Sequence, residues 1–164
     1  MRNIFNQTRR FPKMNQTDKK MITQLRQNAR IPLTKMSNKT SIPVSTLFDR
    51  LKVNENKVIV RHTSLIDFAK LGYNTRANIT LKANIDDRDK LREFLVKHHS
   101  VNSVSRINNG YDFMVEGIFR QIKDMEEFIE TLESRFRIED KKAFFIIEDL
   151  KKEAFMADEN LVFD

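Results

Sequence analysis

The sequence contains no cysteine and only three glycines. Without thiols the chain forms no disulfide, performs no thiolate chemistry and builds no cysteine-based zinc site. Three isolated glycines do not make a glycine-rich phosphate loop. The three histidines do not combine with a nucleophile and an acid in any recognisable catalytic arrangement. We therefore expect no enzyme, no metal and no cofactor.

Long apolar runs are also absent. No run approaches the ~20 apolar residues that a membrane-spanning helix needs. The first 14 residues are basic, but they lack the apolar core and the small-residue cleavage site of a secretory signal. These absences favour a cytoplasmic protein without a membrane partner.

Acidic residues are scarce in the first part of the chain. Residues 1–62 carry 14 Lys and Arg against 3 Asp and Glu, a net charge of +11, whereas residues 63–164 carry 16 against 20, a net charge of −4. Most of the 14 cations lie beyond the flexible basic tail that we expect over residues 1–14. The asymmetry predicts a module that binds a polyanion, nucleic acid rather than a membrane surface, joined to a second module.

The apolar periodicity of residues 15–62 predicts three short helices. The first spans residues 18–28 with Asn15, Thr17 or Asp18 as its cap, and the second spans residues 34–39 with Thr34 as its cap. Pro43 suits the start of a third helix over residues 44–53, whose apolar stripe is Val44, Leu47 and Leu51. A β-rich run over residues 57–61 suits a wing strand. This pattern is typical of a winged helix-turn-helix.

A connector over residues 63–72 leads to a second domain, residues 73–153. Its order of elements is strand, helix, strand, strand, helix, strand, which predicts an α+β, ferredoxin-like βαββαβ fold. The last residues, from 151 onward, either extend the final strand or fray, and residues 154–164 form a C-terminal extension. The six predicted elements span residues 74–83, 86–97, 101–107, 111–119, 122–135 and 143–149.

Four short stretches, in this order and spacing, resemble the Lrp/AsnC, or feast/famine, family of regulators. They are residues 18–34 (DKKMITQLRQNARIPLT), 45–52 (STLFDRLK), 66–73 (IDFAKLGY) and 109–112 (NGYD). The chain departs from the family pattern at Ser41, where a turn glycine is common, and at Pro43, where a serine is common. Residues 52–58 are about one residue shorter than the family's pattern.

The resemblance implies double-stranded DNA as the partner of the first domain. Ser45 and Thr46 would present hydroxyls at the start of a recognition helix. Arg50 either reads a guanine or pairs with Asp49 or Asp18 inside the domain. The remaining expected contacts to DNA, mainly to phosphates, are Thr34, Lys35, Lys39, Lys52 and Arg61.

The resemblance also implies a small-molecule site in the second domain. In the family, effectors such as amino acids bind near the hairpin that corresponds to Asn108, Asn109, Gly110, Tyr111 and Asp112. Gly110 would let a ligand approach the backbone, Asn109 offers an amide and Asp112 would accept an ammonium group. The alternative is a hairpin with no ligand.

We expect a homodimer paired through an open sheet edge, or a tetramer or octamer assembled from dimers, associated with the nucleoid. Three other functions stay open at this point. A tetrapyrrole decarboxylase resembles this family and would use His62, His98 or His99. A nucleoid-type protein would bind DNA without sequence preference, and a small-molecule sensor would act through another protein.

Overall fold

The computed structural model describes residues 14–55 and 57–158. The chain divides into two compact units, one formed by Met1–Leu65 with Lys151–Asp164 and the other by Ile66–Leu150. Within the described ranges, no helix has the length and apolar character needed to cross a membrane.

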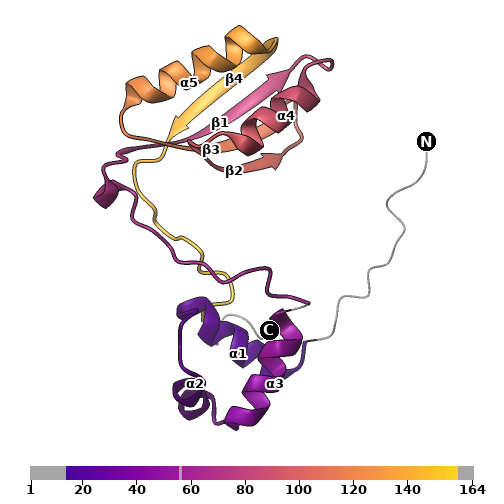
Figure 1. The fold of residues 1–164 in the computed structure, drawn as a ribbon, viewed down its shortest axis with the longest axis vertical. Helices are drawn as coiled ribbons and strands as arrows, with labels where there is room; N and C mark the ends of the chain where they lie inside the picture. The colour runs from indigo at the N-terminus through magenta and orange to yellow at the C-terminus, as the bar shows by residue number, and fades with distance from the viewer. Residues whose placement is uncertain (1–13, 56, 159–164) are drawn as a thin grey trace, which may run out of the picture. The chain divides into compact units, whose positions relative to one another are not determined.

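Three helices form the first unit: α1 (Gln16–Gln27), α2 (Leu33–Thr40) and α3 (Val44–Glu55) (Figure 1). Asn15 caps α1, because its side-chain oxygen accepts a hydrogen bond of 2.8 Å from the N–H of Asp18. Thr34 does not cap α2; Pro32 holds the cap position and Thr34 lies inside the first turn.

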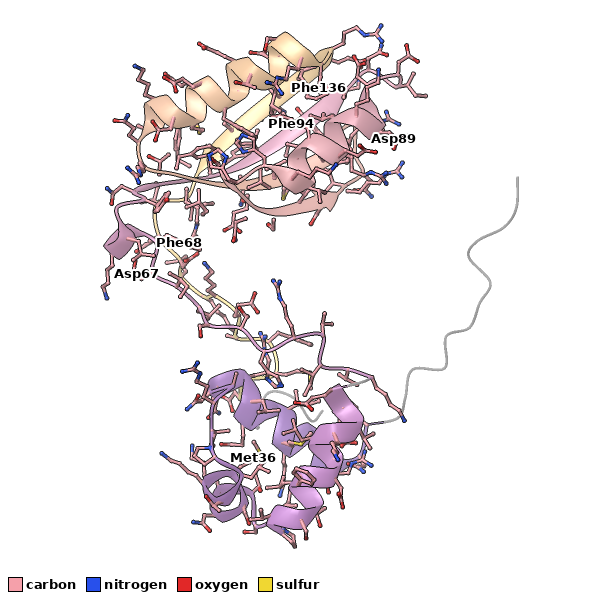
Figure 2. The ribbon with its side chains drawn as sticks, viewed as in Figure 1. Met36, Asp67, Phe68, Asp89, Phe94 and Phe136 are labelled. Carbon is pink, nitrogen blue, oxygen red and sulfur yellow. The ribbon has the colours of Figure 1, made fainter. Side chains whose placement is uncertain are left out.

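The helices of the first unit bury one apolar cluster. It comprises Met21, Ile22, Ile31, Met36 and Leu47, and Met36 has no exposed surface. Figure 2 shows the Met36 side chain among the three helices. Leu51 packs against this cluster as predicted, but Val44 is 40% exposed, so its place in the inward stripe was wrong. Val44 is the first residue of α3 and has no preceding turn to cover it.

The predicted wing strand over residues 57–61 is wrong, since these residues are irregular. A strand needs a neighbour to satisfy its backbone groups, and no described strand of this unit is available to pair with it. Val60 is 96% exposed, so the apolar run is not held by packing either.

Ser41 ends α2 in the left-handed region, with φ of 58°. This conformation costs a residue with a Cβ about 1–2 kcal/mol, whereas glycine adopts it freely. After allowing for the extra freedom of glycine in the unfolded chain, we expect Ser41→Gly to raise the free energy of unfolding by about 0.5–1 kcal/mol. Denaturant unfolding followed on the helical unit measures this change. Gly72→Ala, at φ 86° in the second unit, is the converse substitution and should lower the stability of that unit when its unfolding is followed; a Ser41→Gly protein less stable than the parent would refute the argument.

The second unit contains four strands and two helices, in the order β1 (Thr75–Ala83), α4 (Arg88–Lys97), β2 (Val101–Arg106), β3 (Phe113–Phe119), α5 (Ile122–Arg135) and β4 (Ile138–Phe145), after a single 3₁₀ turn at Ala69–Leu71. The sheet is antiparallel with strand order β2-β3-β1-β4. This is the predicted ferredoxin-like arrangement.

Both helices cover one face of the sheet (Figure 1). The predicted alternation of β1 is confirmed, because Thr75, Ala77, Ile79 and Leu81 are all buried. Leu91 and Leu95 of α4 and Phe128 and Leu132 of α5 join Ile79 and Leu81 in one core. Figure 2 shows Phe94 and Phe136 between the two helices, where their ring centroids lie 5.6 Å apart.

Two details of the sheet differ from the prediction. The pairing of β2 with β3 shifts between Val101 and Ser103, so Val101 and Val104 both pack against the core although strict alternation put them on opposite faces. The last strand was expected over residues 143–149 but begins five residues earlier, at Ile138, and ends at Phe145.

The residues after β4 do not extend the strand. Ile146 donates one further hydrogen bond to the backbone of Arg76, and Asp149 pairs with the Arg76 side chain. From Lys151 the chain belongs to the helical unit.

Candidate functional site

The exposed face of α3 is polar at its start. Ser45 and Thr46 lie in the first turn, exposed to solvent, where backbone N–H groups have no partner within a helix. Phe48, Asp49 and Lys52 continue this exposed face at helical spacing. The Lys52 ammonium lies 5.2 Å from the centroid of the Phe48 ring. The sequence prediction did not single out Phe48, which is 49% exposed and is the one large apolar group at the middle of this face.

The predicted phosphate contacts on α2 are also exposed. Thr34 and Lys35 lie in its first turn and Lys39 lies in its last turn. Together with Ser45, Thr46 and Lys52, these residues form what we call the α2–α3 surface. Arg61 is exposed as well, in the irregular segment that follows α3. Arg9, Arg10 and Lys13 of the basic tail lie outside the described residues.

Arg50 pairs with Asp18. Its Nε donates to Asp18 Oδ1 at 2.7 Å and a terminal nitrogen donates to Oδ2, so the contact is bidentate. Asn54, 4% exposed, donates from Nδ2 to Asp18 Oδ1 at 2.9 Å and to the Arg50 carbonyl at 2.8 Å. The hydrogen bonds and charge of Arg50 hold the pKa of Asp18 below its usual value. In this arrangement Arg50 ties α3 to α1, and Asp18 occupies its guanidinium. Sequence reasoning missed Asn54, whose only signal is its i+4 spacing from Arg50.

The hairpin between β2 and β3 turns through Asn109 at φ 63° and Gly110 at φ 90°. A Cβ at Gly110 would meet no atom within 4 Å, so the positive φ, not crowding, explains the glycine. Asn108, Asn109 and Gly110 are exposed at the tip.

The next two residues of the hairpin are anchored. Asp112 Oδ2 accepts the N–H of Ala83 at 2.9 Å, and Oδ1 lies 2.8 Å from Arg88 Nε. The Tyr111 hydroxyl donates to Asp140 Oδ2 at 2.6 Å, which lowers the pKa of Asp140. The carboxylate of Asp112 therefore fastens the hairpin to β1 and α4. Its expected role as an acceptor for a ligand ammonium group stays a prediction, in which a ligand competes with Arg88.

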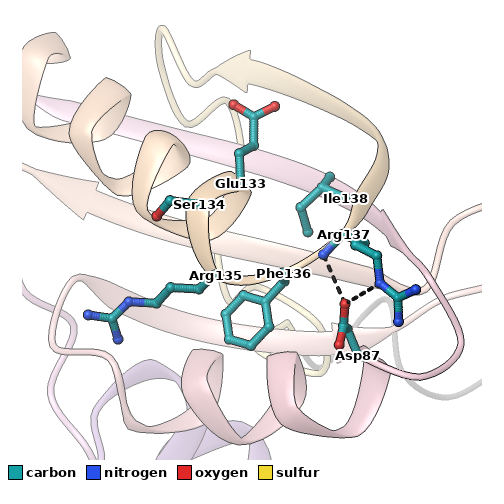
Figure 3. A pocket seen from close by; sticks show the side chains of 7 residues that line it. All are labelled: Asp87, Glu133, Ser134, Arg135, Phe136, Arg137 and Ile138. Atoms are coloured by element: carbon teal, nitrogen blue, oxygen red, sulfur yellow. Dashed lines mark hydrogen bonds and ion pairs between the residues drawn. The ribbon is translucent and has the colours of Figure 1, made fainter.

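A hollow of about 410 Å³ lies at the end of α5 (Figure 3). Asp87 accepts hydrogen bonds from the backbone and side chain of Arg137 at its rim, each 3.0 Å long. The same guanidinium also pairs with Asp86, and Glu133 pairs with Lys141. These charged groups have protein partners, and the hollow contains none of the hairpin residues. The lining residues are Asp87, Glu133, Ser134, Arg135, Phe136, Arg137 and Ile138.

The histidines do not converge on one site. His62 contacts Glu55 at 3.1 Å in the helical unit. His98 lies between the rings of Phe94 and Phe128, and burial lowers its pKa. His99 stacks on His98 with ring centroids 4.6 Å apart. Among the described residues, no group of three or more His, Asp or Glu side chains could hold a metal ion.

Comparisons with known proteins agree with this architecture. Residues 77–155 match the model of the Lrp/AsnC ligand binding domain. The HTH-type transcriptional regulator FL11 of Pyrococcus furiosus is 28% identical over 118 residues, which cover 71% of this chain and 78% of that protein. FL11 of Pyrococcus horikoshii is 25% identical over 140 residues, covering 85% of this chain and 93% of that protein.

Solved structures share the fold. The transcriptional regulator NMB0573 of Neisseria meningitidis, in complex with L-Met, has a TM-score of 0.79 at 22% identity and covers 85% of this chain and 93% of that one. LrpC of Bacillus subtilis has a TM-score of 0.78 at 17% identity and covers 85% of this chain and 98% of that one. The match assigns residues 77–155 to the Lrp/AsnC ligand binding domain family, and the relatives that match most of the chain are named as HTH-type transcriptional regulators.

Proposed function

We propose that this protein is a sequence-specific, DNA-binding transcriptional regulator that uses the α2–α3 surface to bind double-stranded DNA. The observation that carries the proposal is the exposure of hydroxyls and cations together on two consecutive helices joined by a tight turn. Helices joined in this way place the second helix in the major groove and the first across the phosphate backbone.

The residues of the α2–α3 surface divide into two roles. Ser45 and Thr46 start α3, where hydroxyls and N–H groups contact base edges or a phosphate. Thr34 contacts a phosphate, and Lys35, Lys39 and Lys52 neutralise phosphates together with Arg61, which lies outside this surface in the segment that follows α3. Arg50 is not among the DNA contacts in this proposal, because Asp18 holds its guanidinium.

Thr46→Ala tests the base-reading role. We expect this variant to lose about 1–2 kcal/mol of discrimination between a selected duplex and a scrambled one, while its affinity for the scrambled duplex stays unchanged. Fluorescence anisotropy with both labelled duplexes measures the ratio. Thr131→Ala, on α5 of the other unit, is the matched control and should leave both affinities unchanged. Equal losses for the two duplexes would mean that Thr46 does not read bases.

We further propose that a small effector, such as an amino acid, binds at the hairpin of Asn108–Asp112. The relative NMB0573 is a complex with L-Met, which supports an amino acid as the ligand class. The exposed tip offers the Asn109 amide and the backbone at Gly110, while Tyr111 and Asp112 hold the hairpin in place. The histidines are scattered and the relatives are regulators by name, which gives the decarboxylase alternative no support.

We also propose that two copies of the chain pair through the sheet face that α4 and α5 leave uncovered. Met114 and Phe144 are exposed on this face, and Ile118 lies beside Arg76 in the pairing register. Within the described part of the chain, the Thr80 hydroxyl on the same face is buried without a hydrogen-bond partner. The exposed apolar side chains of Met114 and Phe144 on this open face favour a partner there.

Met114→Arg tests the face as the dimer surface. Burying an unpaired charge there should raise the dimer dissociation constant at least about tenfold. Analytical ultracentrifugation over a concentration series measures it. Ile122→Arg, which replaces another exposed apolar residue of the same unit, is the control and should leave the dimer intact. If the Met114→Arg protein dimerises like the parent, this face is not the dimer surface, and the sheet edge becomes the expected contact again.

A further inference from the structure

The segment that follows the sheet domain packs on the helices of the first unit. Residues 151–158, which we call the strap, contribute Met156 to the apolar cluster of Met21, Ile22, Ile31, Met36 and Leu47. Figure 1 shows the strap, in yellow, beside α1. Neither the periodicity of the strap nor its charge indicates such a contact.

Arg26, in the last turn of α1, makes the polar part of this contact. Its Nε donates to the Phe155 carbonyl at 3.0 Å, and a terminal nitrogen donates to the Glu153 carbonyl at 2.6 Å and to the Glu153 carboxylate at 2.9 Å. Gln27 donates from its side-chain nitrogen to the Ala157 carbonyl at 2.7 Å. Two adjacent residues of α1 thus bind three backbone carbonyls of the strap, so the contact depends on the strap's conformation as well as on its charge.

The backbone of the strap is shaped for this contact. Glu153 and Met156 both have positive φ, 50° and 60°, and the N–H of Ala157 donates to the Ala154 carbonyl in a turn. Non-glycine residues adopt positive φ at a cost of about 1–2 kcal/mol each. Such a cost is met only where surrounding contacts stabilise the conformation, and here Arg26, Gln27 and the apolar cluster supply those contacts.

The residues just before the strap are bound to the sheet. Asp149, two residues before the strap, pairs with Arg76 of β1, which raises the pKa of Arg76. Three residues of chain separate Asp149, held by the sheet, from Glu153, held by α1. The contacts of Asp149 therefore end the part of the chain that belongs to the sheet unit, and the strap that follows belongs to the helical unit.

We propose that the strap is a fourth structural element of the helical unit, bound at a site on α1 formed by Arg26, Gln27 and the edge of the apolar cluster. The helices up to Glu55 are in this view incomplete by themselves, and the strap stabilises the helix against which α2 and α3 pack. This inference is independent of DNA binding, since none of its contacts involves the α2–α3 surface.

Amide hydrogen exchange on the full chain and on a chain ending at Leu150 tests the proposal. We expect the amides of α1 to exchange about tenfold faster in the shortened chain, with the amides of β1 and β3 unchanged. Equal exchange of α1 in the two chains would overturn the proposal. Loss of all three helices with the sheet intact would support it.

Full-length variants test the same site without removing residues. Arg26→Gln removes the guanidinium and should speed α1 exchange about fivefold, because the lost hydrogen bonds are partly exposed to water. Lys20→Gln, an exposed cation on the same helix, is the matched control and should exchange like the parent. If the shortened chain loses its sheet as well, the two full-length variants test the proposal. Faster exchange of the α1 amides in Arg26→Gln alone supports binding of the strap to α1. Identical exchange of these amides in Arg26→Gln and Lys20→Gln overturns it.

Discussion

Replacing Asp18 with alanine is expected to lower the free energy of unfolding of the helical unit by about 2 kcal/mol. The carboxylate is 3% exposed and accepts hydrogen bonds from Arg50 and Asn54, with the N–H of Asp18 itself bound to the Asn15 cap. Its removal leaves the buried Asn54 amide with one partner fewer and frees the guanidinium that joins α3 to α1. Denaturant unfolding, followed by a probe in the helical unit, measures the change.

Asp49→Ala is the control for this substitution. Asp49 precedes Arg50 on the same helix but is exposed, and its removal should change stability by no more than about 0.5 kcal/mol. If the two variants lose equal stability, the Asp18 pair does not hold the helices together, and Arg50 becomes available again as a reader of guanine.

The Asp18 pair also predicts a dependence on pH. Because hydrogen bonds from Arg50 keep the pKa of Asp18 below its ordinary value in the folded chain, the folded state holds this proton less tightly than the unfolded state does. The resulting stabilisation is fully present above a pH of about 4 and is lost as the pH falls through the lowered pKa. Asp18→Ala should lose this part of the acid sensitivity, and an unchanged acid profile would contradict the assignment.

Replacing Lys35 and Lys39 together with glutamine is expected to weaken binding to duplex DNA about 50-fold near 0.1 M salt and to reduce the slope of log K against log salt by about 1.8. Each lysine that neutralises a phosphate releases counterions, and both side chains are exposed on α2. Fluorescence anisotropy titrations at salt concentrations between about 0.05 and 0.2 M measure the slope.

The control is a charge-matched pair from the second unit. Lys90 and Lys97 are exposed on α4, and their replacement with glutamine leaves the net charge of the chain equal to that of the α2 variant. The control should keep the parental slope. If both pairs change the slope equally, DNA contacts the protein through its overall charge and not through the α2–α3 surface.

The sequence correctly predicted the helices and strands whose apolar residues recur at the regular spacing of that element. Helix α5 matches its predicted bounds, 122–135, because Met125, Phe128 and Leu132 mark one buried face. Strand β4 has no such set of regularly spaced, buried apolar residues. Its first half is polar and exposed, and it is a strand because it pairs with β1, which only the folded chain reveals.

The sequence likewise predicted only part of the candidate site. The exposed hydroxyls and lysines of α2 and α3 follow from local spacing. The partner of Arg50 does not, since Asp18 lies 32 residues earlier in the chain and the choice between it and Asp49 depends on how α1 packs on α3. The bulge in β2 and the path of the strap are likewise properties of tertiary packing that no local pattern encodes.

Selection of bound sequences from a random duplex pool, using the full chain near physiological salt, tests the central claim of sequence-specific DNA binding most directly. We expect a two-fold-related motif whose half-sites lie about one helical turn, ~34 Å, or a multiple of it apart, as a dimer with two recognition helices requires. Enrichment should be weaker in Thr46→Ala, because this variant lacks one base contact. Binding that is steeply dependent on salt but enriches no sequence would contradict the claim and identify an architectural binder, and no binding at all would leave the α2–α3 surface without a role in DNA recognition.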